Sequence, residues 1–167
     1  MKAIMRRKPL GYRPADPRIT TIFIDSCAFD PKYSPEDQAS LSLFKLSEEG
    51  ELILNIAHST QKEVEHPNTP GWVKREANKL IYTIETSLTS NEQSGKAKIL
   101  RILAGNGKPE KMAKDAEHVF EADKYGAYFV TTDERILKKR EELKDIVSVH
   151  ILKPSELLAI INSYKVS

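Results

Sequence analysis

The chain has 167 residues, of which 40% are hydrophobic, and this is enough to bury the core of one domain. The net charge of +2 does not suit a protein that coats nucleic acid non-specifically, and apolar runs such as 22–24 and 52–54 are far too short to cross a bilayer. Cys27 is the only cysteine, so no disulfide can form within the chain. Together with the lack of an apolar signal segment at the start, these features predict a cytoplasmic protein with no membrane partner.

The first 18 residues differ in composition from the rest of the chain. They carry six basic residues against a single acidic one, Asp16, so that the remainder of the chain has a net negative charge. Several prolines and the lack of an apolar period predict an extended basic leader over residues 1–18. The leader is either a solvated segment or a contact for nucleic-acid phosphates. The candidate phosphate contacts are Arg6, Arg7 and Lys8.

The first third of the chain predicts a strand, a helix and a second strand. An apolar, β-branched run predicts a buried parallel strand over residues 19–25. Prolines indicate a loop over 30–35. Apolar residues at helical spacing then predict a helix from Glu36 to about Gly50, followed by a strand over 51–56.

The middle of the chain predicts mainly helices. A short helix is expected over 59–66, because the residue before a proline resists helical geometry. Residues 72–84 predict another helix, although β-branching at 80–84 leaves a strand open there. A further helix is expected over 89–104. We therefore interpret 72–107 as a helical, insertion-like region.

The last third alternates between helices and strands. Helices are expected over 109–125, 133–143 and 154–161, and strands over 127–131 and 146–151. This alternation predicts an α/β fold with a mainly parallel central sheet.

Four acidic residues stand where an α/β fold gathers its chemistry, near the carboxyl ends of the strands. Asp25 ends the first strand, and Asp133 directly follows the third. Glu63 lies on the short helix after the second strand, and Asp115 lies on the helix that leads into the third. Each residue also has a simpler interpretation, because acidic residues commonly cap helices or lie in solvent.

The position of Asp115 on its helix favours convergence of these acids. The apolar face of that helix consists of Met112, Ala116, Val119 and Phe120. Asp115 falls on the flank of this face, so its side chain can reach the edge of the core where the strand ends gather. The four acids are therefore expected to form one cluster.

A cluster of carboxylates requires a cation, since like charges raise one another's pKa. Ligands that are all oxygen favour Mg²⁺ or Mn²⁺ over zinc. The corresponding chemistry is metal-assisted attack of water on a phosphodiester, in which the metal lowers the pKa of the water.

The acids lie within segments that form a larger pattern. These segments are Ile22-Phe23-Ile24-Asp25-Ser26, residues 59–64, Asp115-Ala116-Glu117-His118 through Gly126 to Val130-Thr131-Thr132-Asp133-Glu134-Arg135-Ile136-Leu137, and Lys153-Pro154-Ser155-Glu156-Leu157-Leu158. In this pattern the chain resembles PIN-domain nucleases over roughly residues 19–163. The stretch from Asp115 to Asp133 is the most specific part, because acid, glycine, strand, threonine and final acid all follow the family's spacing.

The resemblance implies a three-layer α/β/α sandwich over residues 19–167 and a Mg²⁺- or Mn²⁺-dependent endoribonuclease. It implies that Asp25, Asp115 and Asp133 bind the metal directly or through water. Glu63 would bind the metal through water or orient the nucleophile.

Further residues take supporting roles in this interpretation. Thr131 and Ser26 would support the site beside the metal ligands. Glu65 remains an alternative to Glu63 as the site glutamate. Lys138 lies on a basic helix that either touches RNA phosphate or faces solvent.

Three hypotheses for function remain open. The first is a metal-dependent endoribonuclease with RNA as its substrate. The second is a VapC-like toxin that uses the same chemistry and pairs with an antitoxin protein. The third is a non-catalytic RNA-binding or assembly module with the same fold. Such domains often form pairs, which leaves a homodimer open, and the sequence does not fix the oligomeric state.

Three more residues carry expectations of their own. Cys27 is predicted to be a small buried residue rather than a nucleophile. His118 is predicted to face solvent, since it lies away from the apolar face of its helix, with support of Asp115 as the alternative. Asp123 is either a fifth acid of the site or a marker of the helix end.

Overall fold

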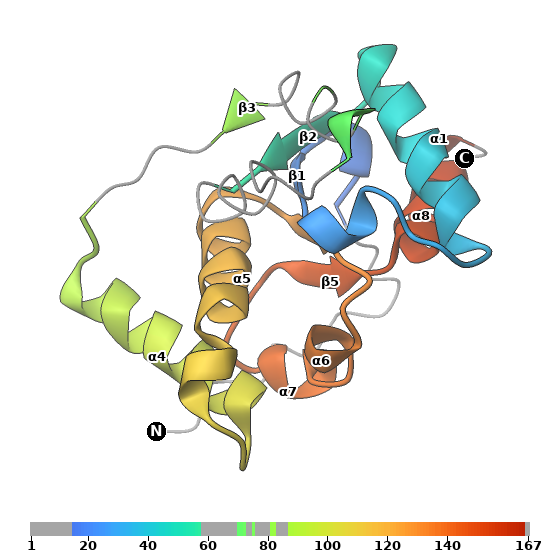
Figure 1. Ribbon diagram of the computed structural model, residues 1–167. Coiled ribbons are helices and arrows are strands. Elements are labelled where there is room, and N and C mark those ends of the chain that lie inside the picture. Colours follow the sequence, from blue (N-terminus) through green and yellow to red (C-terminus); the bar gives the residue numbers. More distant parts are fainter. Residues whose placement is uncertain (1–14, 58–69, 73–74, 76–80, 83–86, 166–167) are drawn as a thin grey trace.

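The computed structural model describes residues 15–57, 70–72, 75, 81–82 and 87–165. The strands within these described ranges are β1 (Thr21–Ile24), β2 (Ile53–Ile56), β3 (Ile81–Tyr82), β4 (Tyr128–Val130) and β5 (His150–Leu152). They form one sheet in the order β3-β2-β1-β4-β5, and every pairing is parallel (Figure 1). The predicted α/β class with a parallel central sheet is therefore confirmed.

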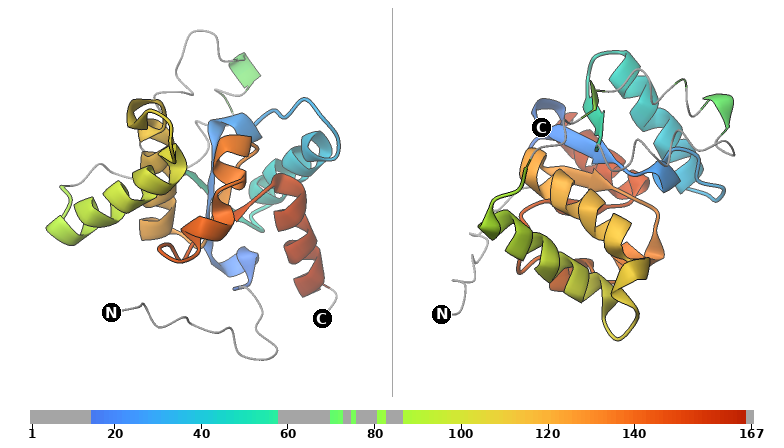
Figure 2. Two further views of the ribbon diagram at one scale, coloured as in Figure 1. Left: turned by 90° about the horizontal axis from the view of Figure 1, so that it is seen from below. Right: turned by 60° about the vertical axis from the view of Figure 1, so that its left-hand side comes forward.

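Helices cover both faces of this sheet. The longer ones are α1 (Glu36–Glu48), α4 (Ser90–Ala104), α5 (Ala113–Tyr125) and α8 (Pro154–Lys165). The shorter ones are η1 (Pro17–Ile19), η2 (Ser26–Ala28), η3 (Pro109–Lys111), α6 (Glu134–Leu137) and α7 (Arg140–Leu143). In Figure 2 (left), α1 and α8 lie on one side of the strands and α4 and α5 on the other, which confirms the predicted three-layer sandwich. None of the helices in the described ranges is long and apolar enough to cross a membrane.

The central strand β1 distributes its side chains between two cores. Successive side chains of a strand point to opposite faces of the sheet. Ile22 and Ile24 accordingly pack with buried residues of α1 and α8, whereas Phe23 packs with those of α4 and α5. All three side chains are at most 1% exposed, and burial of each stabilises the fold by about 1.5–3 kcal/mol. This burial on both faces explains the continuous apolar run in the sequence.

Gly126 allows the turn after α5 to lie directly against β1. A Cβ atom at this position would lie 2.7 Å from Phe23 Cδ2 and 2.9 Å from the carbonyl oxygen of Thr21. Both distances are too short for a side chain, so the close approach of this turn to β1 requires glycine.

Some elements differ from those expected. Ile81–Tyr82 is an edge strand that pairs with Asn55 and Ile56, so the strand alternative holds there, and part of the 72–107 region belongs to the sheet. The helix expected over 133–143 is divided into α6 and α7. The helix expected over 59–66 lies outside the described residues.

The end of the predicted leader contacts the domain. Residues Pro17–Ile19 form η1, which packs near α8. The hydroxyl of Tyr128 in β4 donates a hydrogen bond to the carbonyl oxygen of Ala15. The leader residues that are described thus belong to the folded domain, and residues 1–14 lie outside the described part of the chain.

Candidate functional site

The order of strands reverses between β1 and β4. From β1 the chain adds β2 and β3 on one side, and it then places β4 and β5 on the other. In open parallel sheets, ligands bind beyond the carboxyl ends of the strands at such a switch point. Asp25 directly follows β1, and Asp133 lies three residues after the end of β4, so both residues stand at this place.

Asp25 is buried and held by several donors. It is 3% exposed and caps η2, with its Oδ1 atom accepting the backbone N–H of Ser26 at 2.9 Å. Its Oδ2 atom accepts the hydroxyl of Thr131 at 2.9 Å and lies 3.3 Å from the sulfur of Cys27. These contacts orient the carboxylate and compensate for part of its removal from water.

Thr131 connects Asp25 to Asp133. Its side chain is fully buried, and its Oγ1 atom accepts the backbone N–H of Asp133 at 3.1 Å while donating to Asp25. Asp133 itself caps α6, because its Oδ1 atom accepts the backbone N–H of Arg135 at 2.9 Å. One hydroxyl therefore fixes the two loops that leave the central strands.

Asp115 approaches the same edge of the sheet from α5. A helix that precedes a parallel strand begins near the carboxyl ends of the strands, and Asp115 lies in the first turn of α5. Burial, together with the nearby charges of Asp133 and Asp25, raises the pKa of this carboxyl to about 6, although Arg135 opposes the rise. The pKa of Asp115 therefore reflects the charges of both other aspartates.

Arg135 lies between two of these carboxylates. Its Nε and Nη2 atoms donate to Asp133 Oδ1 and Oδ2 at 3.1 Å and 2.8 Å, and Nη2 also lies 3.4 Å from Asp115 Oδ2. The two aspartates raise the pKa of the guanidinium, chiefly through the hydrogen bond to Asp133, so Arg135 remains charged. Because both carboxylates contact the same Nη2 atom, they face one another across a single cation.

The structure thus brings part of the predicted set together. Asp25, Asp115, Asp133, Thr131 and Ser26 gather at one edge of the sheet. Glu63 and its alternative Glu65 lie outside the described residues, as do Arg6, Arg7 and Lys8. Lys138 follows α6 and is exposed.

The donor chemistry of the three aspartates fits a hard divalent cation, since carboxylates supply only oxygen ligands. However, within the described ranges no three His, Cys, Asp or Glu side chains are close enough to form a metal-binding group. Mg²⁺ usually keeps several waters and binds through one or two carboxylates. In ligand type the three aspartates would fit a hydrated ion that some of them contact only through water.

Two predictions about neighbouring residues are wrong. Cys27 is exposed rather than buried. Its sulfur nevertheless contacts Thr131 and Thr132, and desolvation of that atom together with the charge of Asp25 raises the pKa of the thiol to about 12. A thiol with this pKa is not a nucleophile at neutral pH. His118 is 1% exposed rather than solvated, because a helical wheel does not show what packs against its polar side.

Asp123 binds backbone away from the other acids. Its Oδ1 atom accepts the N–H groups of Ser148 and Val149 at 2.8 Å and 3.1 Å. It thereby ties α5 to the segment that leads into β5, which begins at His150 rather than at 146 as expected. This role is structural, and Asp123 lies in the last turn of α5, at the helix end that the second alternative named.

Arg135 is a site residue to which the sequence interpretation gave no role, although it lies in one of the segments that carry the resemblance. Arg135 lies two residues after Asp133, which caps α6, and a side chain at that position can reach the capping carboxylate. The sequence therefore indicates the contact between Arg135 and Asp133. Nothing in the local sequence indicates the contact between Arg135 and Asp115, since that contact joins two separate helices, α6 and α5.

A comparison with protein-family models and with curated proteins finds no match to the chain.

Proposed function

We propose that this chain is a Mg²⁺- or Mn²⁺-dependent ribonuclease of the PIN-domain type. The observation that carries the proposal is the convergence of Asp25, Asp115 and Asp133 from three elements onto the switch point of the sheet. The raised pKa of Asp115, to which both other aspartates contribute, supports this convergence. Carboxylates that raise one another's pKa are a common feature of functional sites.

The acidic residues of the site would bind the metal ion or orient the attacking water. Asp25 and Asp133, held by Thr131, offer oriented oxygen atoms, and Asp115 adds a third carboxylate from α5. A bound divalent cation would lower the pKa of a water molecule and offset charge that develops on the phosphate. Glu63 remains the predicted residue for orienting the attacking water.

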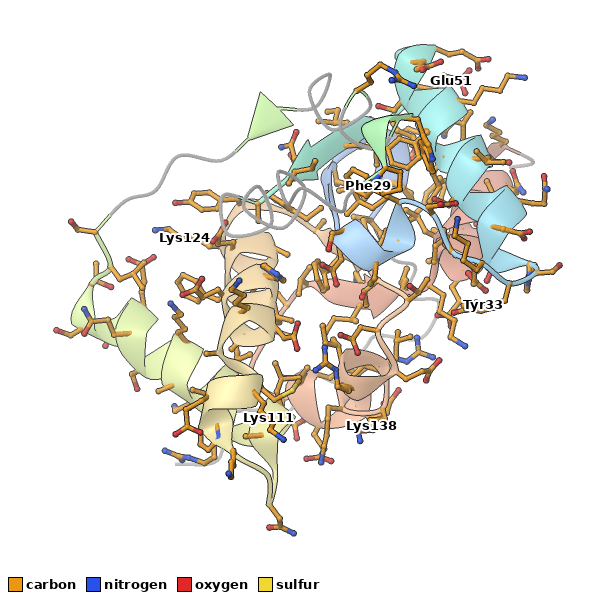
Figure 3. The ribbon with its side chains drawn as sticks, viewed as in Figure 1. Phe29, Tyr33, Glu51, Lys111, Lys124 and Lys138 are labelled. Carbon is orange, nitrogen blue, oxygen red and sulfur yellow. The ribbon has the colours of Figure 1, made fainter. Side chains whose placement is uncertain are left out.

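Two exposed basic residues lie close in the sequence to site aspartates, since Lys111 precedes Asp115 and Lys138 follows Asp133. Lys111 in η3 and Lys138 after α6 are both exposed and lie in the lower half of Figure 3. Neither pairs with a carboxylate among the residues that the structure describes. The α4–η3 connection also approaches the α6–α7 junction, because a Cβ atom on Gly105 would lie 3.4 Å from Lys139 Nζ. Exposed basic side chains on these segments would suit a nucleic-acid substrate.

RNA cleavage tests this proposal. End-labelled single-stranded RNA is incubated with Mn²⁺ and with wild-type protein, Asp25→Asn, Asp133→Asn or the control Asp145→Asn, whose aspartate is exposed. We expect cleavage by wild type and Asp145→Asn and at least a hundredfold lower rate in the other two variants, as is typical when an electrostatic group at the reacting centre is lost. Equal cleavage by all four proteins, or no cleavage by any of them, contradicts the proposal. In the second case, retained binding of the RNA favours the non-catalytic binding module.

A further inference from the structure

The guanidinium of Arg135 is more exposed than the two carboxylates that it contacts. The side chain of Arg135 is 57% exposed, whereas those of Asp115 and Asp133 are 12% and 16% exposed. Because more than half of the Arg135 side chain is in solvent, the guanidinium can move away from the carboxylates without opening the core.

Arg135 contacts the carboxylate oxygen atoms that would bind a metal ion at this site. It binds both oxygens of Asp133 at 3.1 Å and 2.8 Å, and it lies 3.4 Å from Oδ2 of Asp115. A divalent cation between these carboxylates would bring a second positive centre to the same oxygens. Like charges at such distances repel one another, so the ion and the guanidinium cannot both keep these contacts.

We infer that Arg135 is an internal counter-ion that a divalent metal displaces from Asp115 and Asp133, and that the displaced guanidinium then binds a phosphate of the RNA. This inference rests on the proposed function, since it requires a metal at the aspartates. Without metal, Arg135 neutralises carboxylates that would otherwise repel one another. With metal, it weakens the affinity for the ion but supplies a bidentate donor beside the reacting phosphate.

If Arg135 both competes with the metal ion and binds an RNA phosphate, one substitution should strengthen metal binding and weaken RNA binding. Arg135→Gln removes the competing charge, so it should tighten Mn²⁺ binding by about tenfold, the order of effect of a charge at contact distance that is screened by water. The same variant loses the phosphate contact, so it should raise the KM for single-stranded RNA by about tenfold at saturating Mn²⁺. Arg135→Lys retains the charge without the fork of donors, so its Mn²⁺ affinity should stay close to that of wild type while its KM rises.

Calorimetric titration with Mn²⁺ alone measures the first effect, and steady-state cleavage measures the second. Arg101→Gln is the matched control, because Arg101 is exposed on α4 and forms no ion pair within the described ranges. We expect it to bind Mn²⁺ as wild type does. Melting curves of each variant establish that the protein is folded.

Particular outcomes separate this inference from the proposed function. If wild type binds Mn²⁺ and Arg135→Gln binds it equally or more weakly, the counter-ion role is overturned while the metal site stands. If Arg135→Gln binds Mn²⁺ more tightly but keeps the KM of wild type, the phosphate role is overturned. If neither wild type nor Arg135→Gln binds Mn²⁺, both the inference and the proposed metal site are overturned.

Discussion

At the scale of single residues, the hydroxyl of Thr131 holds the loops after β1 and β4 together. It donates to Asp25 Oδ2 at 2.9 Å and accepts the N–H of Asp133 at 3.1 Å. Thr131→Val keeps the shape of the side chain but leaves both partners without this contact. We expect the free energy of unfolding to fall by about 1–3 kcal/mol in urea titrations, because a buried polar group loses its partner.

Thr131→Ser is the control for this prediction, since serine keeps the hydroxyl of threonine and lacks only the methyl group. It should recover most of the stability that the valine variant loses. Equal stability of the valine variant and wild type would show that the Thr131 hydroxyl does not hold Asp25.

The raised pKa of Asp115 predicts how stability depends on pH. Its ordinary pKa is 3.8, and its pKa in the folded protein is about 6, so the folded state binds this proton more tightly than the unfolded state. Ionisation of Asp115 therefore opposes folding, and its unfavourable effect grows from about pH 4 to pH 6 and persists above that range. Asp115→Asn should raise the free energy of unfolding at pH 7.5 by up to about 3 kcal/mol, and by much less at pH 4.

Chemical denaturation without metal at these two pH values checks this prediction. The matched control is Asp145→Asn, which removes an exposed aspartate and should change stability little at either pH. A loss of stability in Asp115→Asn at pH 7.5 would mean that the ion pair with Arg135 outweighs the burial of the charged carboxylate and its repulsion from Asp133 and Asp25.

At the scale of elements, the turn from α5 into β4 depends on a single glycine. Gly126→Ala would place a methyl group 2.7 Å from Phe23 Cδ2, so either the turn or β1 must shift. We expect about 1–3 kcal/mol of destabilisation in thermal or urea unfolding, which is typical of overpacking.

Gly95 in the middle of α4 provides the opposite case. No atom lies within 4 Å of a Cβ added there, so Gly95→Ala should raise stability by about 0.5–1 kcal/mol. If both alanine variants gained stability, the close contact of Gly126 with β1 would not exist in solution.

Local sequence patterns predicted the buried strands and the longer helices. They failed where the pairing of two distant segments decides the structure. The run at 22–24 is apolar because β1 is buried on both faces, and this property is visible in the sequence. The edge strand at Ile81–Tyr82 exists through its pairing with β2, so its propensity alone could not separate strand from helix.

The acids themselves were predictable because each one stands next to a strand or on the flank of an apolar helix face. Their neighbours were harder to predict. His118 is buried although its helix alone places it on the polar side. Arg135 contacts Asp115 only because α5 and α6 meet at the same edge of the sheet.

At the scale of the whole molecule, the candidate site exists only through the order of the strands. Asp25, Asp115 and Asp133 are separated by long stretches of sequence, and they meet because β4 pairs directly with β1. A metal that binds this arrangement binds the folded state alone. It should therefore stabilise the fold in proportion to the logarithm of its concentration above the dissociation constant.

The most direct measurement of the central claim is a Mn²⁺ titration of metal-free protein at pH 7.5, followed by calorimetry or by the electron paramagnetic resonance signal of free Mn²⁺. The proteins compared are wild type, Asp25→Asn, Asp115→Asn, Asp133→Asn and the control Asp145→Asn. The convergence of three carboxylates predicts saturable binding in wild type and Asp145→Asn, and at least tenfold weaker binding in each of the other variants. The absence of saturable binding in wild type, or unchanged affinity in all the variants, would contradict the assignment of these aspartates to a metal site.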